Sequence, residues 1–208
     1  MLGLSLTTLI SRVLTLVIAF TVHEFSHALA ADQLGDDTPR LQGRLTLNPL
    51  VHLDPVGSLM LIIAGFGWAR PVQINPYVIQ RRTPAGPMIV AFAGPFSNLL
   101  LALVATIPIR AGLISVYSSS FLSQFFVEFI WINLILLFFN LLPIFPLDGE
   151  KILDYFLPPR GQDLLGQIRP YGMYILMGLI ILGSFGSFDL FGLIVGKPAM
   201  SIMELLVL

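Results

Sequence analysis

The sequence predicts an all-α, multi-pass membrane protein with about four to six transmembrane helices. Of its 208 residues, 56% are hydrophobic and only 11% are charged, and the mean hydropathy is +0.87. These values are too apolar for a soluble domain. The apolar residues also form long runs separated by turn formers and charges. We expect one integral membrane domain over residues 1–208, with a core over about 4–160 and a C-terminal helical segment over about 168–208.

The long apolar runs give the predicted spans, because a helix needs about 20 mostly apolar residues to cross the hydrocarbon core. The first run has no basic N-terminal region and no small-residue cleavage site, so we interpret it as a retained span rather than a signal peptide. Residues 188–208 are apolar but interrupted by glycines, Asp189 and Lys197, which leaves open a bent further helix or a surface segment. The four predicted spans are 4–31, 87–109, 124–147 and 171–187.

Two shorter segments lie between the first and second spans. Residues 55–68 are apolar but few for a span and contain glycines, which favours a re-entrant segment. In residues 67–76, "GWARPVQINP", Val72 and Ile74 alternate with Pro71 and polar residues, which predicts a short strand. Pro71 has no backbone donor, so this strand should lie at an edge.

Composition also excludes several kinds of partner and ligand. The net charge of −1 and the lack of a basic tail argue against nucleic-acid binding, and the expected surroundings are the lipid bilayer. The chain has no cysteine, so it has neither disulfides nor thiolate ligands. A metal site would have to use histidine, carboxylate or backbone oxygen ligands.

The motif "HEFSH", residues 23–27, places three ionisable side chains inside the first apolar run. On a helix, His23 and His27 lie on one face about 5 to 6 Å apart, close enough to bind one zinc ion. Glu24 lies about 100° further round, where a carboxylate can take a proton from a zinc-bound water and pass it to the leaving amine. Each such residue at membrane depth costs about 2.5 to 3.5 kcal/mol, which favours a functional role over chance.

A catalytic zinc usually has a third protein ligand. The stronger candidate is Asp148, which follows an apolar run ending in Pro143 and Pro146. These prolines free backbone carbonyls, and such a segment is tolerated in a membrane only where it faces protein or a wet cavity. The alternative is His52, in a polar loop beside Asp54, where a turn or capping role is the simpler interpretation.

Three motifs occur in order: "HEFSH", "AGPFSN" at 93–98 and "NLLPIFPLDG" at 140–149. Over about residues 10–160 the chain resembles the site-2 proteases, intramembrane zinc metalloproteases, in their compact bacterial form without a PDZ or regulatory domain. The resemblance implies a three-helix catalytic core in a bacterial inner membrane, and cleavage of transmembrane helices in membrane-protein substrates. It also implies zinc ligands His23, His27 and Asp148, the general base Glu24, and Asn140 as a residue that holds the substrate or the developing oxyanion.

The residues of "AGPFSN" also have a structural interpretation. Gly94 and Pro95 can begin a helix, and small residues allow helices to pack closely in a bilayer. Asn98 can provide a hydrogen bond between packed helices.

The shared zinc ion also predicts the topology. His23, His27 and Asp148 lie at the C-terminal ends of two spans, which must run parallel, and residues 87–109 supply one crossing between them. Residues 55–68 should therefore not cross. Most basic residues then lie on the zinc side, which makes that side cytoplasmic and places the N-terminus outside. The basic residues on that side are Arg40, Arg44, Arg70, Arg81, Arg82, Lys151, Arg160 and Arg169.

Three questions remain open at this stage. The edge-like segment with Val72 and Ile74 is expected to hold an unwound substrate by β-addition. Arg12, inside the first span, either snorkels to the outer surface or lines a substrate path. Two other functions use the same residues: a zinc-binding membrane transporter, and a catalytically silent scaffold for membrane helices. Glu24 discriminates among them, because only hydrolysis requires it.

Overall fold

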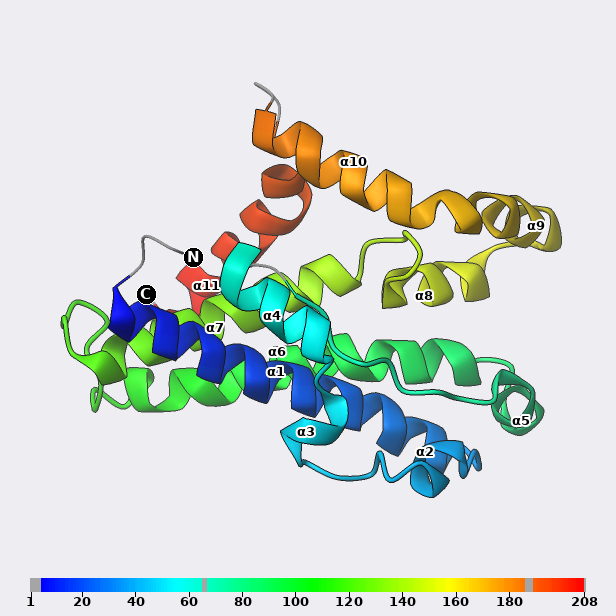
Figure 1. Cartoon of the computed structure of the whole chain (residues 1–208), viewed down its shortest axis with the longest axis horizontal. Helices are drawn as coiled ribbons and strands as arrows, with labels where there is room; N and C mark the ends of the chain where they lie inside the picture. Colours follow the sequence, from blue (N-terminus) through cyan, green and yellow to red (C-terminus); the bar gives the residue numbers. More distant parts are fainter. Residues whose placement is uncertain (1–4, 65–66, 186–188, 208) are drawn as a thin grey trace.

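The computed structural model describes residues 5–64, 67–185 and 189–207, and these are almost entirely helical (Figure 1). The helices are α1 Leu6–Gln33, α2 Thr38–Leu41, α3 Pro49–His52, α4 Pro55–Ala64, α5 Pro76–Arg82, α6 Gly86–Arg110, α7 Phe121–Asn140, α8 Asp148–Phe156, α9 Pro159–Ile168, the 3₁₀ turn η1 Arg169–Tyr171, α10 Gly172–Phe185, the π-helical turn η2 Gly192–Gly196 and α11 Lys197–Val207.

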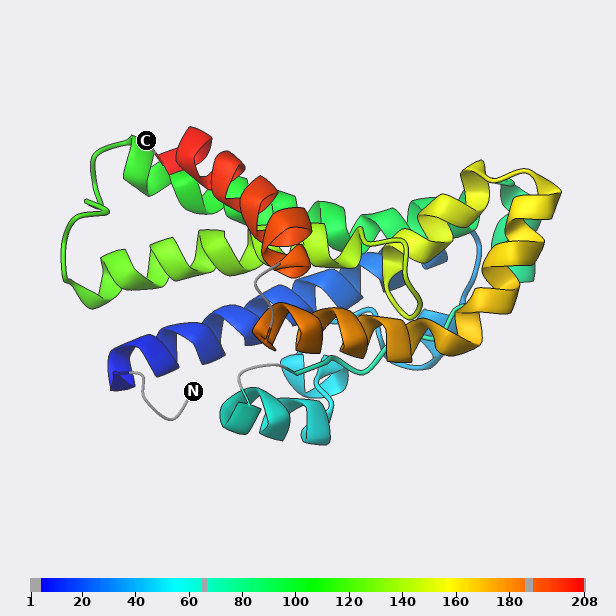
Figure 2. The same ribbon diagram turned by 90° about the horizontal axis from the view of Figure 1, so that it is seen from above.

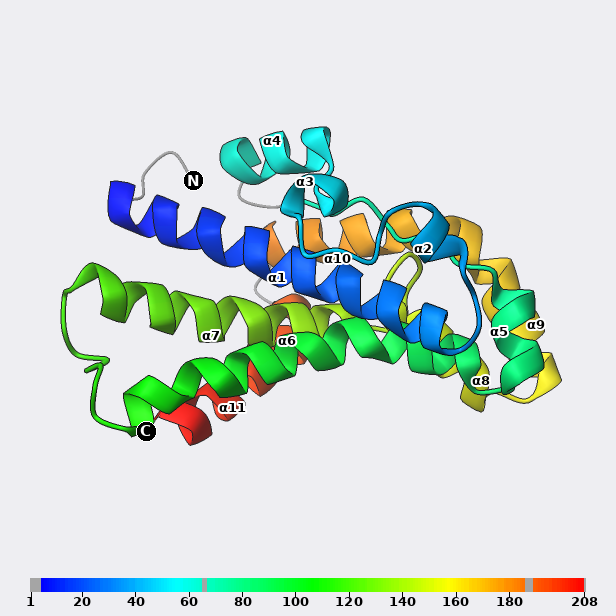
Figure 3. The same ribbon diagram turned by 90° about the horizontal axis from the view of Figure 1, so that it is seen from below.

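The helices α1, α6 and α7 form the core of the bundle. Figure 3 shows α1 and α7 running in the same direction, with α6 antiparallel to both, as the shared-ligand argument predicted. Buried alanines on α1 and α6, Ala19, Ala28 and Ala102, have no exposed surface and allow close packing. On α7, Ile130 and Leu134 fill the interior against α6 and α11.

Among the described residues, four helical stretches are long and apolar enough to cross a membrane. Three are α1, α6 and α7, and the fourth runs from Pro159 to Ile181 through α9, η1 and α10. The third span was predicted to end at 147, but α7 stops at Asn140, because Pro143 and Pro146 cannot continue the hydrogen-bonding of a helix. It also begins earlier than predicted, where the Ser120 side chain accepts a hydrogen bond from the backbone N–H of Ser123.

The prediction that residues 55–68 do not cross the membrane agrees with the described part of this segment, which is not among the four candidate spans. The helix α4 has ten residues, about 15 Å, roughly half the hydrocarbon thickness. The chain then returns to its starting point: Leu53 and Ala69 form an antiparallel bridge, and the N–H of Arg70 donates to the carbonyl of His52 across 2.7 Å. Both ends of the segment therefore lie at the same level of the bundle.

The predicted strand is wrong. In the described part of the chain no strand forms, and β-pairing is limited to the isolated bridge at Leu53 and Ala69. The reason is that side chains take the backbone donors that a ladder would use. The N–H of Val72 donates to Glu24 Oε2 (3.1 Å), and that of Asn75 donates to Asp36 Oδ2 (2.6 Å). Residues 70–75, here called the strap, are therefore held along α1 without a partner strand.

The C-terminal part covers the bundle on another side. The 3₁₀ turn at Arg169–Tyr171 separates α9 from α10 at a marked bend (Figure 2). The last residues of the predicted span 171–187 lie outside the described residues. After them, α11 packs on α6 and α7, and Arg110 donates to the carbonyls of Leu205 and Leu206. Of the two possibilities left open for 188–208, the described residues therefore form a packed helical segment.

Candidate active site

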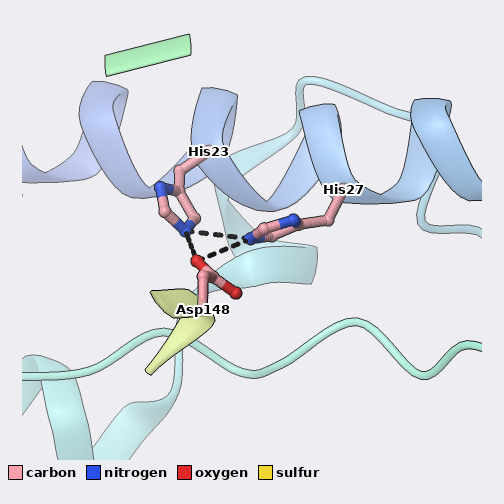
Figure 4. A group of neighbouring side chains, drawn as sticks. All are labelled: His23, His27 and Asp148. Atoms are coloured by element: carbon pink, nitrogen blue, oxygen red, sulfur yellow. Dashed lines mark hydrogen bonds and ion pairs between the residues drawn. The ribbon is translucent and has the colours of Figure 1, made fainter. Parts of the chain in front are cut away.

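Two histidines of α1 and one aspartate of α8 meet inside the bundle (Figure 4). The Nε2 atoms of His23 and His27 are 3.0 Å apart, and Asp148 Oδ2 lies 3.2 Å from each of them. All three residues are buried, with exposed fractions of 6%, 8% and 8%. The predicted metal-ligating residues are thus brought together, and one ligand atom from each lies within 4.8 Å of the others.

Two glycines make this approach possible. A Cβ on Gly94 of α6 would lie 2.3 Å from His27 Nε2 and 2.6 Å from His23 Nε2, so only glycine leaves room beside the histidines. A Cβ on Gly149 would lie 2.2 Å from the carbonyl oxygen of Leu141, where the chain turns back after α7. The helix-start interpretation of Gly94 and Pro95 is wrong, since α6 begins at Gly86, whereas the close-packing interpretation is confirmed.

In each histidine, the hydrogen-bond partner of Nδ1 determines whether the Nε2 atom of the neutral ring carries a lone pair. His27 Nδ1 lies 2.7 Å from the carbonyl oxygen of Val90, which can only accept, so Nδ1 donates and, in the neutral ring, Nε2 keeps its lone pair. His23 Nδ1 lies 2.7 Å from Asn98 Oδ1, also an acceptor. When both rings are neutral, two imidazole lone pairs and a carboxylate oxygen therefore converge on one point. A cation stabilises such a set of acceptors, either a proton on an imidazole or a metal ion, and the donor set suits zinc.

The charge state of Asp148 agrees with a ligand role. Burial by itself would raise the pKa of this carboxyl, but attraction to His27 and hydrogen bonds with His23 and His27 outweigh it, and the pKa lies well below its usual range. The side chain is therefore held as a carboxylate, the form that binds a metal ion.

The other predicted site residues surround a cavity of about 130 Å³ beside the histidines. Glu24 lines it and accepts the hydrogen bond from Val72 of the strap. Val72 and Ile74 line the same cavity, as does Asn140 at the end of α7. Asn140 Nδ2 donates to the carbonyl of Leu136 (3.0 Å), which is one turn earlier.

The sequence left alternatives open for two further residues. His52 is fully buried in α3, with Nε2 donating to the carbonyl of Thr46 (2.7 Å), and it is not part of the histidine–aspartate group. Arg12 pairs with Glu128 of α7, with 3.1 Å between Nε and Oε2, and it does not line the cavity beside the histidines. Sequence reasoning missed Lys151, which lines the cavity three residues after Asp148, a spacing that shares one helix face.

Comparison with known proteins agrees with this geometry. The sequence profile described as peptidase family M50 matches residues 106–183. YwhC of Bacillus subtilis, by name a candidate zinc metalloprotease, is 42% identical over 181 residues, which are 83% of this chain and 82% of YwhC. The chain belongs to peptidase family M50, the site-2 proteases.

Two further relatives of this M50 protease are the Rip2 proteins of Mycolicibacterium smegmatis and Mycobacterium tuberculosis, also candidate zinc metalloproteases by name. They are 34% identical over 168 residues and 30% identical over 171 residues, in each case 79% of this chain and 64% of the relative. No solved structure matches the chain. With its four apolar helices, the M50 protease is an integral membrane zinc metalloprotease.

Proposed function

We propose that this M50 protease hydrolyses peptide bonds within or near the transmembrane helices of membrane proteins, with one zinc ion held by His23, His27 and Asp148. The observation that carries the proposal is the convergence of three buried acceptors, 3.0 to 3.2 Å apart, inside an apolar helix bundle. Buried acceptors of this kind need a cation, and a site inside such a bundle is suited to substrates that reach it from the bilayer.

Glu24 is the proposed general base. When bound, zinc supplies a Lewis acid that makes a water more acidic and polarises the scissile carbonyl. Glu24 is not one of the three converging ligands, yet it lines the same cavity, and this supports a role in taking a proton from a water there. The same group can return that proton to the leaving amine. Asn140 and the cationic Lys151 line the cavity where the carbonyl oxygen of a substrate would gather negative charge.

The strap is the proposed docking edge for the unwound substrate. Its N–H groups at Val72 and Asn75 are bound by side chains of the protein, whereas Gln73 and Ile74 give theirs to no protein group among the described residues. An extended segment with free donors and acceptors can pair with an extended peptide, and Val72 and Ile74 face the cavity where that peptide would be cut.

The orientation in the membrane is also a proposal. Figure 1 shows α2, α5, α8 and α9 gathered at the end of the bundle where α1 terminates, and these elements and their loops carry most of the basic residues. Arg110 lies at the opposite end, at the close of α6. By the positive-inside rule, the active site faces the cytoplasm of a bacterial cell and the N-terminus lies outside. Residues 1–208 would then act as a single membrane domain.

The proposal is tested by reconstituting the purified protein in liposomes with model transmembrane helices and locating the cuts by mass spectrometry. We expect one zinc ion per chain and cuts within or next to the apolar stretch of the helix. The isosteric variant Asp148→Asn, which lacks the charged ligand, should lose both zinc and cleavage. A zinc-loaded protein that moves zinc across the liposome but cuts no helix would support the transporter instead.

A further inference from the structure

Two asparagines lie in the middle of the bundle, where a membrane protein normally has apolar side chains. Asn98 of α6 and Asn133 of α7 are both fully buried. Burying an amide without hydrogen bonds is strongly unfavourable. Both are paired: Asn98 Nδ2 donates to Asn133 Oδ1 across 2.9 Å, and Asn133 Nδ2 donates to the carbonyl of Phe129 across 2.9 Å.

The far end of this chain of bonds is His23. Asn98 Oδ1 lies 2.7 Å from His23 Nδ1, so the bonds connect α7 through α6 to α1. We call the series from His23 through Asn98 and Asn133 to the Phe129 carbonyl the asparagine relay.

The direction of every bond in the relay follows from its last member. A backbone carbonyl can only accept, so Asn133 must turn its Nδ2 towards Phe129 and its Oδ1 towards Asn98. Asn98 must then use Nδ2 to reach Asn133, which leaves its Oδ1 facing His23. An amide oxygen beside Nδ1 requires the proton on that nitrogen, so the neutral His23 ring keeps a lone pair on Nε2.

We propose that Asn98 and Asn133 are positioning residues that fix the tautomer of His23, so that α7 controls the affinity of the site for zinc. The inference rests on the proposed function in that it takes the histidine–aspartate group to bind zinc. Neither asparagine lies among the three converging ligands. Each acts through His23, by making its Nε2 available before the metal arrives.

The two histidines differ in how their tautomers are held. His27 Nδ1 donates to the backbone carbonyl of Val90, which no side-chain substitution removes. His23 depends on an amide that can rotate by half a turn, and in the described part of the chain only Asn133 fixes which way that amide faces. Without Asn133, Asn98 can turn either its Oδ1 or its Nδ2 towards His23. With Nδ2 there, the lone pair of the neutral ring lies on Nδ1 instead of Nε2.

The first test measures zinc affinity by chelator competition in the purified full-length protein. Removing an outer partner of a metal-binding histidine typically weakens binding by about 10- to 100-fold. We expect a loss of this size for Asn98→Leu and about tenfold for Asn133→Leu, each of which keeps the branched side-chain skeleton and removes the amide. The matched control is Thr106→Val on the same helix, whose buried hydroxyl donates to the carbonyl of Leu103 and to no other group among the described residues, and zinc affinity should not change.

A double-mutant cycle separates the relay from a simple packing defect. In Asn98→Asp both carboxylate oxygens accept, so His23 Nδ1–H finds an acceptor whichever way the group turns. Asn133→Leu should therefore weaken zinc binding in the wild-type background and have little effect in the Asn98→Asp background. Equal losses in both backgrounds, or wild-type affinity in Asn133→Leu, would overturn the inference.

A second readout needs no metal. The chain has three histidines, and ¹⁵N chemical shifts of the metal-free protein report which nitrogen of each ring carries the proton. His52 serves as a reference, because its Nε2 faces a carbonyl and it has the opposite tautomer to His23. We expect His23 protonated at Nδ1 in the wild type and a mixture in Asn133→Leu. An unchanged tautomer overturns the relay, whereas failure of the wild type to bind zinc would contradict only the proposed function.

Discussion

The backbone N–H of Val72 donates to the Oε2 atom of Glu24 across 3.1 Å. This one bond ties the strap to the helix that carries the histidines, at the residue assigned as the general base. A second hydrogen bond holds the strap three residues later, where the N–H of Asn75 donates to the buried carboxylate of Asp36. Between these two hydrogen bonds lie Gln73 and Ile74, whose backbone N–H groups have no protein partner among the described residues, and Ile74 lines the cavity beside the histidines.

Replacing Ile74 by proline tests the docking edge. Proline removes a backbone donor that no protein group uses and also restricts the residue before it, so substrate pairing should suffer while the ligands stay in place. We expect turnover of transmembrane substrates to fall and the zinc content to remain that of the wild type. Val72→Pro should act in the same direction and also removes the bond to Glu24.

The control for this experiment is Ile74→Leu, which keeps the backbone N–H and a similar apolar volume. It should cleave at nearly the wild-type rate. Wild-type turnover in Ile74→Pro, measured on the same substrate, would remove the strap from the account of substrate binding.

Gly94→Ala should disrupt the zinc site through sterics alone. The added methyl group would lie 2.3 Å from His27 Nε2, closer than any real contact of a Cβ atom, so a histidine or α6 itself must move. We expect zinc affinity to fall by at least about tenfold, the effect of displacing a ligand or its outer partner. Chelator competition measures it.

Gly166→Ala is the matched control for this substitution, since a Cβ there meets nothing within 4 Å on the helix α9. It should leave zinc affinity unchanged and make α9 slightly more stable, because alanine is the better helix former by up to about 1 kcal/mol. Full zinc affinity in Gly94→Ala would contradict the arrangement of α1 and α6 described above.

The fold could be predicted from the sequence where residues far apart in the chain must meet at one site. The need for His23, His27 and Asp148 to share one ion was enough to predict that α1 and α7 run parallel and that residues 55–68 return to their starting side. The prediction of a strand failed because side chains, instead of a neighbouring strand, accept the backbone hydrogen bonds of this segment. The alternation at Val72 and Ile74 is typical of a strand, but Glu24 and Asp36, far away in sequence, take the donors.

The asparagine relay is another feature that sequence patterns do not reveal. Asn98 was predicted only as a packing hydrogen bond, and Asn133 lies 35 residues further along the chain inside an apolar run. No periodicity links the two, and only the crossing of α6 and α7 brings them together. Lys151 had a usable signal, since it lies one helical turn after Asp148.

The ion pair between Arg12 and Glu128 should stabilise the end of the bundle where α1 and α7 begin. Breaking a fully buried pair costs about 3 to 5 kcal/mol. Here the side chains are 35% and 18% exposed, so we expect a smaller loss. Arg12→Met should lower the melting temperature in detergent, and the charge-reversed double variant Arg12→Glu/Glu128→Arg should recover most of it.

The comparison for this pair is Arg40→Met, which breaks the surface pair with Asp32, where the Arg40 side chain is 65% exposed. Exposed pairs contribute little to stability because solvent screens them, so the melting temperature should hardly change. Equal shifts for Arg12→Met and Arg40→Met would show that the inner pair has no special role in holding α1 to α7.

The central claim is that Glu24 serves as the base for hydrolysis at a zinc ion that it does not bind. Its most direct test is the isosteric variant Glu24→Gln, with zinc content and helix cleavage measured on the same liposome preparation. We expect one zinc ion per chain, as in the wild type, and cleavage slower by about 10²- to 10⁴-fold, the usual contribution of a general base. Cleavage at the wild-type rate by zinc-loaded Glu24→Gln would contradict it.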